Sequence, residues 1–221
     1  EGDKIAVALS GGKDSITLLY ALHTLQRFYP KHFEIMAITI HPDSDTFNTE
    51  KLEKMCKDLN IEYVIYHSDL SNILFNVRQE KNPCSLCANL RRGMLNTLAV
   101  EHGCNKIALG HHLDDAIETL LMNMCLNGNI HTFSPVTTFG NNQITVIRPL
   151  IYVYEKETRA LARKMNFPVM GKCCPKDGYT MREYMKQLVI QLRKYIPKVR
   201  ENLIGSIIRS DIPGWKKPNK D

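Results

Sequence analysis

A short apolar run that opens directly into a glycine-containing loop constrains the fold of this chain more than any other feature. The run is Lys4–Leu9 (KIAVAL), the loop is Ser10–Ser15 (SGGKDS), and leucines at helical spacing follow up to about Phe28. Continuous hydrophobicity of this length is typical of a buried parallel strand. A strand, a tight loop and an amphipathic helix in this order predict an α/β domain with a ligand site beyond the carboxyl end of the first strand.

The same alternation continues along the chain. Further strands are predicted at Phe33–Ile40, Glu62–His67, Lys106–Gly110 and Gln143–Arg148. Helices are predicted at Thr46–Leu59, Glu155–Met165, Arg182–Tyr195 and Lys198–Arg209, and another follows the strand Lys106–Gly110 and continues to about Cys125. Alternating strands and helices predict a doubly wound parallel sheet with right-handed crossovers and helices on both faces. We divide the 221 residues into an α/β domain over 1–170 and a helical C-terminal region over 171–221.

Cysteine usage and charge restrict the compartment and the partners. Seven cysteines, at uneven spacing and without a secretory signal, favour reduced thiols in the cytoplasm over disulfides. No apolar run is long enough for a transmembrane helix, so we expect no membrane partner. Because the chain begins at Glu1 without a methionine, we expect a short segment to precede it.

The net charge of +6 is concentrated near the end of the chain. Between Arg182 and Lys220 there are ten Lys and Arg against three Asp and Glu, so the remainder is close to neutral. A basic region on a nearly neutral body suits a polyanionic partner, although a solvated helical face has the same composition.

The loop Ser10-Gly11-Gly12-Lys13-Asp14-Ser15 has the composition of a phosphate-binding turn. Its glycines let the backbone approach a phosphate, the helix N-terminus directs N–H groups at it, and the lysine and serines add further donors. The adjacent glycines exclude a Walker A loop, which needs four residues between its glycine and its Gly-Lys pair. SGGKDS resembles the PP-loop of the ATP pyrophosphatases. That resemblance implies the adenine nucleotide α-hydrolase fold, ATP cleavage between the α- and β-phosphates, and adenylation of a substrate oxygen.

A second polar segment, Gly110-His111-His112-Leu113-Asp114-Asp115, follows a predicted strand and therefore belongs to the same edge of the sheet. Its carboxylates suit Mg²⁺ bound with ATP phosphates, but capping the next helix is the commoner role of a lone Asp. The segment resembles the LGHxxDD pattern of the same superfamily. On that basis Asp14 and Asp115 are the expected catalytic carboxylates, and Gly110 and His111 are expected to contact the nucleotide. Packing in the core is the alternative for His111 and His112.

Cysteines form a second candidate site. Cys84 and Cys87 begin a helix at a spacing that suits one metal, a cluster or a redox pair. Cys173 and Cys174 lie far along the chain, and adjacent cysteines rarely both reach one metal, so three ligands rather than four are available. Three thiolates favour a [4Fe-4S] cluster whose open iron can bind sulfur, with structural zinc and a catalytic persulfide or disulfide as alternatives. The remaining cysteines, expected in the core, are Cys56, Cys104 and Cys125.

The segments CSLCANLRRG, KIALGHHLDD, ETLLMNM and VIRPL, between Cys84 and Pro149, together resemble the tRNA 2-thiocytidine synthetase (TtcA) family. The resemblance extends more weakly along the whole chain. It implies that ATP and Mg²⁺ serve thiolation of cytidine 32 in tRNA, with sulfur from a cysteine desulfurase or from free sulfide. It places Cys174 beside Cys84 and Cys87 as the third ligand, and Cys173 remains the alternative. The oligomeric state, including a homodimer, is left open.

Arg91 lies one helical turn beyond Cys87 and is a candidate for contacting the phosphates or the adenylated intermediate. A surface arginine beside Arg92 is the equally weighted alternative. Two other functions also fit these residues. A ligase resembling tRNA lysidine synthetase would adenylate the same oxygen without a cluster, which leaves the cysteines unexplained. A non-catalytic iron–sulfur or nucleotide-binding regulator of RNA would turn over no ATP.

Overall fold

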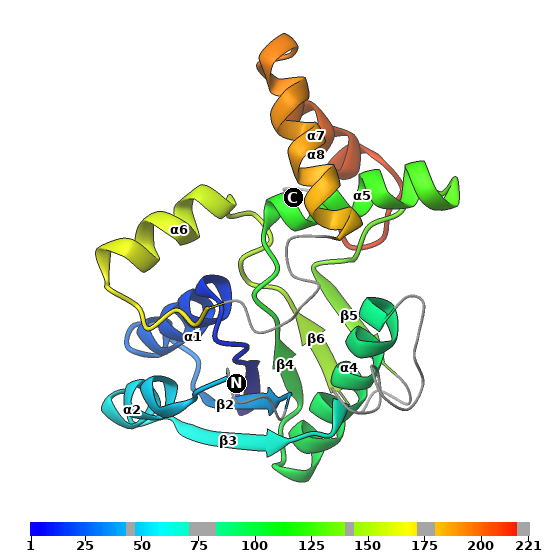
Figure 1. Cartoon of the computed structure of the whole chain (residues 1–221). Helices are drawn as coiled ribbons and strands as arrows, with labels where there is room; N and C mark the ends of the chain where they lie inside the picture. The colour runs from blue at the N-terminus through cyan, green and yellow to red at the C-terminus, as the bar shows by residue number, and fades with distance from the viewer. Residues whose placement is uncertain (43–46, 71–82, 140–143, 172–179, 216–221) are drawn as a thin grey trace.

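The computed structural model describes residues 1–42, 47–70, 83–139, 144–171 and 180–215, with only the backbone for 83–85 and 139 (Figure 1). Over these ranges the strands form one sheet in the order β3-β2-β1-β4-β6-β5. They are β1 (Asp3–Ala8), β2 (Phe33–His41), β3 (Glu62–His67), β4 (Lys106–Ala108), β5 (Val136–Phe139) and β6 (Ile144–Ile147). Neighbouring strands are parallel except β5 and β6. The predicted doubly wound sheet is confirmed, and the strand order reverses between β1 and β4, where such sheets bind ligands.

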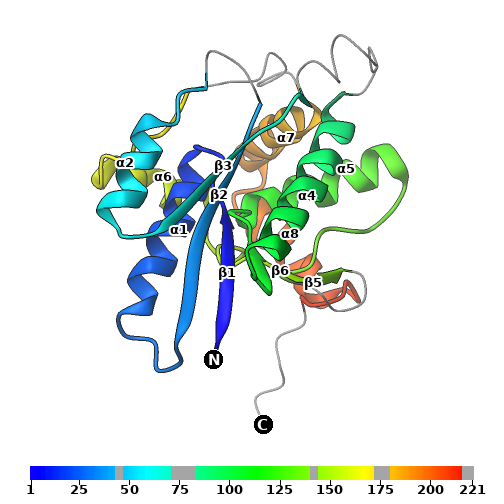
Figure 2. The same ribbon diagram turned by 90° about the horizontal axis from the view of Figure 1, so that it is seen from below.

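Helices cover both faces of the sheet (Figure 2). The described helices are α1 (Lys13–Gln26), α2 (Glu50–Asp58), α4 (Pro83–Glu101), α5 (Leu113–Asn127), α6 (Glu155–Lys164), α7 (Met181–Tyr195) and α8 (Val199–Arg209). Side chains alternate along β1, so Ile5 and Val7 pack with α1 and α2, while Ala6 packs with α4 on the opposite face. This two-sided burial explains the continuous apolar run in the sequence.

Two elements differ from the sequence-based expectation. β5 was not predicted, because a four-residue strand at a sheet edge has too few positions to show a period. It is held by antiparallel pairing with β6, from Val136 opposite Ile147 to Phe139 opposite Ile144. The second helix was predicted from Thr46, whereas α2 begins at Glu50; residues 43–46 lie outside the described ranges.

The helices α7 and α8 pack on α5, above the end of the sheet in Figure 1. Their shared hydrophobic cluster includes Ile117 of α5, Val189 of α7, Ile207 of α8 and the fully buried Trp215. The indole Nε1 of Trp215 donates a hydrogen bond to the Phe133 carbonyl at 2.9 Å. The C-terminal helical region and the α/β domain therefore share one buried cluster. None of the described helices combines the length and the hydrophobicity that crossing a bilayer requires.

Candidate functional site

The glycine loop lies between β1 and α1, at the switch point of the sheet, and two close approaches fix its shape. Gly11 has φ +79°, and a Cβ there would lie 2.3 Å from Sδ of Met170. The Met170 N–H donates to the Gly11 carbonyl at 2.9 Å. A Cβ on Gly110 would lie 3.0 Å from the backbone of Asp14. The positive φ favours glycine at Gly11, and a side chain at Gly110 would press on the backbone of Asp14, so the two predicted nucleotide segments are in contact.

The start of α1 is arranged to receive an anion. Its N-cap residue, Gly12, contributes no side-chain cap, which leaves the first-turn N–H groups open to a ligand. The serines shape the loop: Oγ of Ser15 donates to the Gly12 carbonyl at 2.9 Å and accepts from the Ser10 N–H at 3.2 Å. The two hydroxyls lie 3.2 Å apart. Ser15 is 5% exposed, so its hydroxyl holds the loop closed rather than facing solvent.

Lys13 is held by two carboxylates. Its Nζ lies 2.7 Å from Oδ2 of Asp14 and 3.1 Å from Oε1 of Glu155, the first residue of α6. Glu155 also pairs with Lys186 of α7 at 2.8 Å and with Arg159 at 2.9 Å. Burial alone would raise the pKa of Glu155, but hydrogen bonds and charge from Lys186 and Lys13 hold that pKa far below its usual range. Sequence reasoning missed Glu155, because nothing local to α6 indicates that its first residue faces the loop.

His112 connects the loop to the second polar segment. It is the N-cap of α5, where its Nδ1 accepts from the Asp115 N–H at 3.3 Å and its own N–H donates to Oδ2 of Asp115 at 2.9 Å. Its Nε2 lies 3.8 Å from Oδ2 of Asp14. Since Nδ1 accepts a hydrogen bond, the proton of a neutral His112 lies on Nε2, facing Asp14. The structure thus brings Asp14 and Asp115 to opposite sides of one imidazole.

The neighbouring carboxylate, Asp114, has a different environment. It is 6% exposed, and its Oδ2 accepts the Glu155 N–H at 2.8 Å, which caps the start of α6. Its Oδ1 lies 3.4 Å from Nε of Arg200 on α8. Asp115 therefore takes part in capping the helix that follows, α5, which was one of the two alternatives for this Asp pair, and it also lies beside the loop. Asp114 instead caps α6.

His111, which precedes the N-cap of α5, has a buried ring nitrogen. The Nδ1 of His111 has no hydrogen-bond partner among the described residues, and its ring stacks on Phe133 at a centroid distance of 4.9 Å. Burial lowers the pKa of His111 to about 4, so this side chain is neutral near pH 7.

Glu118 of α5 is a second titratable group near Asp115. Burial raises the pKa of Glu118 to about 7, and the charge of Asp115 adds to that effect. Arg182 of α7 lies 3.4 Å from Glu118 and 3.6 Å from Oδ1 of Asp115.

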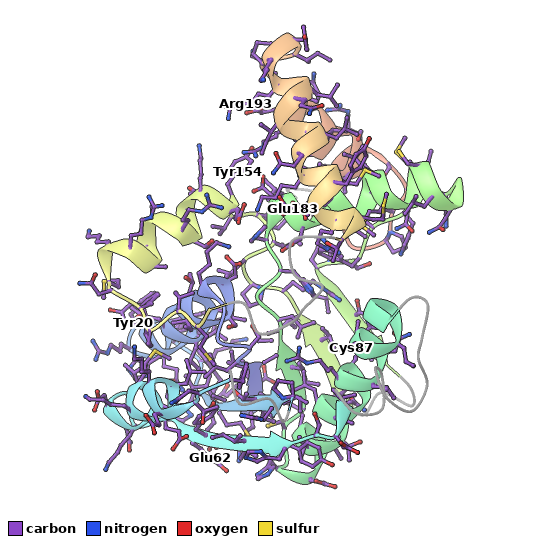
Figure 3. All side chains as sticks on the ribbon, in the orientation of Figure 1. Tyr20, Glu62, Cys87, Tyr154, Glu183 and Arg193 are labelled. Atoms are coloured by element: carbon purple, nitrogen blue, oxygen red, sulfur yellow. The ribbon has the colours of Figure 1, made fainter. Side chains whose placement is uncertain are left out.

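The start of α4 brings cysteine to the same region. The helix crosses from β3 to the parallel strand β4, so its N-terminus returns to the carboxyl edge of the sheet. Cys87, labelled in Figure 3, is half-buried on this helix, and Arg91 donates from Nη2 to the carbonyl of Ile40 in β2 at 3.3 Å. Arg91 therefore lies at the carboxyl edge of the sheet, whereas Arg92 is exposed.

The other cysteines divide between core, surface and undescribed positions. Cys56 and Cys104 are buried as predicted, but the prediction that Cys125 is buried was wrong. Cys125 lies in the last turn of α5, where Met124 and Leu126 are also exposed. The side chain of Cys84, and Cys173 with Cys174, lie outside the described ranges. Within those ranges no three Cys, His, Asp or Glu side chains are grouped to hold a metal.

Comparison with known proteins identifies the family. Residues 1–191 match the PP-loop domain family ATP_bind_3. The tRNA-cytidine(32) 2-sulfurtransferase of Citrifermentans bemidjiense is 41% identical over 210 residues, which cover 94% of this chain and 82% of the relative. The enzyme of the same name from Ralstonia pickettii is 37% identical, over 96% of this chain and 68% of the relative. The structure of the U34-tRNA thiolase NcsA from Methanococcus maripaludis with its [4Fe-4S] cluster has a TM-score of 0.76 at 25% identity, over 92% of this chain and 70% of that one.

The matched range contains both polar segments, the CxxC pair and the start of α7. The SGGKDS loop and the Gly110–Asp115 segment, which are in contact in the structure, both lie within the range that matches the family. This chain therefore belongs to the PP-loop family, and within it to the family of the tRNA-cytidine(32) 2-sulfurtransferases.

Proposed function

We propose that this chain catalyses the ATP-dependent insertion of sulfur into tRNA, with the cytidine at position 32 as its target. The observation that carries the proposal is the convergence of three segments at one edge of the sheet: the SGGKDS loop, the helix start at Asp115, and the start of α4 with Cys87 and Arg91. The names of the curated relatives support the substrate and the reaction.

The loop binds ATP through its backbone. The polyphosphate lies against Gly11 and Gly12 and accepts hydrogen bonds from the first turn of α1, where the helix dipole favours negative charge. Lys13 then exchanges part of its contact with Glu155 for phosphate oxygens. Gly110 lets the second segment approach the loop closely enough to contact the nucleotide.

The chemistry proceeds in two steps that balance without an oxidant or a reductant. The C2 oxygen of cytidine attacks the α-phosphorus of ATP, and pyrophosphate leaves with the electrons of the broken P–O bond. A sulfide-level sulfur then attacks C2 and AMP leaves with the former C2 oxygen, which gives 2-thiocytidine, AMP and pyrophosphate. A cysteine desulfurase or free sulfide is the proposed source of the sulfur.

Two carboxylates serve this chemistry. Asp14 and Asp115 are the proposed ligands of Mg²⁺ bound with the phosphates, since this ion prefers carboxylate and phosphate oxygens. His112 holds the two in register through its contacts at 3.8 Å and 3.3 Å. His111 is neutral near pH 7 and its Nδ1 lacks a partner among the described residues. Its Nδ1 can therefore form a hydrogen bond with the bound nucleotide without a change of charge.

The cysteines fit an iron–sulfur cluster in donor chemistry and spacing. Cys84 and Cys87 are three residues apart at the start of α4, a spacing that suits one cluster, and thiolates are the ligands of such clusters. Cys174 is the proposed third ligand, with Cys173 as the alternative. Held by these three cysteines, a [4Fe-4S] cluster would supply an iron without a protein ligand, to which the sulfur would bind. Arg91 is positioned by Ile40 to neutralise charge between this site and the nucleotide.

Analysis of tRNA nucleosides by mass spectrometry tests the proposal. A strain lacking the gene should lose 2-thiocytidine, and the wild-type gene should restore it, while Asp115→Asn should not. Purified protein with ATP, sulfide and tRNA should release AMP and pyrophosphate in step with thiolation. Release of AMP without formation of 2-thiocytidine would favour a ligase resembling lysidine synthetase. Absence of any ATP turnover would favour a regulator.

A further inference from the structure

The outer side of α7 carries two tyrosines that the reaction above does not use. Tyr184 is 62% exposed, and Tyr195, the last residue of the helix, is 85% exposed. Eleven residues make close to three helical turns, so the two rings lie on the same side of α7, roughly 16 Å apart along its axis. The opposite side of the helix buries Met185 and Val189. The tyrosines therefore face away from the hydrophobic cluster.

The basic residues of the C-terminal helices separate into two sets. One set is paired with carboxylates beside the nucleotide loop and consists of Arg182, Lys186 and Arg200. The other set is exposed, forms no salt bridge within the described part of the chain, and consists of Arg193, Lys194, Lys198 and Arg209. From Gln187 to Lys198 the sequence contains the first three of these cations and no acid. Most of this unpaired positive charge thus lies at the end of α7 that carries Tyr195.

The side of α7 that carries Tyr184 and Tyr195 leads along the helix to the proposed active site. α7 begins next to Asp115, through the contact of Arg182 at 3.6 Å, and Tyr195 lies roughly 20 Å further along the axis. Figure 3 shows α7 leaving α5 near Glu183 and carrying Arg193 away from the sheet. A nucleic acid that lies along the outer side of α7 therefore reaches the edge where the phosphate loop and Asp115 meet.

We propose that this side of α7, formed by Tyr184, Lys194, Tyr195 and Lys198 and here called the α7 outer surface, binds unpaired nucleotides of the tRNA substrate. Bases stack on Tyr184 and Tyr195, and phosphates pair with Lys194 and Lys198. Stacking on an aromatic ring requires an open base face, so loop nucleotides fit this surface and a continuous duplex does not. The inference rests on the proposed function, because it takes tRNA as the substrate.

A second copy of this chain is the other occupant that an exposed aromatic surface allows. A symmetric dimer through this surface would place Lys194 and Lys198 of one copy against the same two cations of the other. Such like charges repel, whereas a phosphate backbone neutralises them and releases its counterions. Charge complementarity therefore favours RNA over self-association.

Binding of two RNAs to the full chain tests the inference: the anticodon stem-loop, and a blunt duplex of the same length. Changing both Tyr184 and Tyr195 to Ala should weaken stem-loop binding about tenfold or more and leave duplex binding unchanged. Changing both to Phe should preserve stem-loop binding, because the ring is kept. Phe28→Ala is the matched control, since Phe28 is 71% exposed after the end of α1, at the opposite edge of the sheet.

Salt dependence separates stacking from charge. Replacing Lys194 and Lys198 with Gln should reduce the slope of log affinity against log salt by about two for both RNAs, while the Tyr→Ala pair should leave the slope unchanged. Unchanged stem-loop binding by the Tyr→Ala pair would overturn the inference, and a dimer that then dissociates in sedimentation would assign the surface to self-association. If the wild type binds the stem-loop through these tyrosines but thiolates no tRNA, the surface stands and the proposed function fails.

Discussion

The hydroxyl of Thr158 on α6 donates a hydrogen bond of 2.5 Å to Oδ1 of Asp14 in the phosphate loop, across 144 residues of sequence. Thr158 is 1% exposed, so this contact is protected from water. It fixes one oxygen of Asp14 and directs the other, Oδ2, toward Lys13 and His112. A residue on a distant helix therefore sets the orientation of a proposed catalytic carboxylate.

Removing this donor should impair adenylation more than folding. Thr158→Val keeps the volume but leaves Oδ1 of Asp14 without its partner, at a cost of about 1–3 kcal/mol. We expect ATP–pyrophosphate exchange to fall about tenfold, whereas Thr158→Ser, which keeps the hydroxyl, should stay near wild type. Wild-type exchange in the Val variant would show that Asp14 does not depend on this contact.

Glu155 should respond to ATP in a way that its neighbours do not. Glu155→Gln removes the charge that balances Lys13, Lys186 and Arg159, so the variant should lose about 2 kcal/mol of unfolding free energy. Because a nonhydrolysable ATP analogue restores negative charge beside Lys13, it should raise the melting temperature of the variant more than that of wild type. Equal shifts would separate Glu155 from the phosphate site.

The loss of stability caused by Glu155→Gln should also depend on pH. The pKa of Glu155 is lowered in the folded chain, so its contribution is complete above pH 4.5, the ordinary value for Glu, and declines as the pH falls. The difference in unfolding free energy between wild type and Glu155→Gln should therefore shrink as the solution becomes more acidic. A difference that grows in acid would contradict the assigned ion pairs.

Glu118 should show the opposite pH dependence. Its pKa rises from 4.5 to about 7 on folding, so the folded chain favours the protonated form, and the associated stability is complete below pH 4.5 and lost as pH rises through 7. Glu118→Gln is neutral throughout. Its unfolding free energy relative to wild type should increase between pH 4.5 and 8, by up to roughly 3 kcal/mol. A flat difference in urea titrations across this range would contradict a buried carboxyl with a raised pKa.

Iron content should identify the thiol ligands. Anaerobically purified wild type should contain about four irons per chain and absorb near 400 nm. Cys87→Ser and Cys174→Ser should lose iron and thiolation, and Cys173→Ser should keep both. Cys125→Ser is the matched control, because this thiol is exposed at the far end of α5. One equivalent of zinc without iron would exclude the cluster, and the reverse result for the adjacent pair would make Cys173 the ligand.

Much of the fold could be predicted because its signals are local. The apolar run of β1, the glycines after it and the period of α1 lie within Lys4–Phe28, and α6, α7 and α8 were predicted to within a residue or so at either end. β5 could not be found, since its four residues owe their conformation to pairing with β6. Cys125 was placed in the core by its apolar neighbours, but α5 extends past the helices that cover it.

The site was predictable only where residues adjacent in sequence act together. Gly11, Gly12 and Lys13 form a unit that a short pattern reveals, and so do His112 and Asp115 at the start of α5. Glu155 and Thr158 reach the same loop from α6, and Lys186 reaches Glu155 from α7. No periodicity or spacing encodes such contacts, because they depend on how the helices pack on the finished sheet.

Trp215 is the one tryptophan of the chain, and it is fully buried beside Tyr152 and the Phe133 carbonyl. Its intrinsic fluorescence consequently reports a single place: the cluster that joins the C-terminal helices to α5. The emission maximum should be blue-shifted while that cluster is intact and move to the red when the helices separate from α5. Undocking of the proposed RNA-binding surface can therefore be followed in the unlabelled protein, independently of any assay of catalysis.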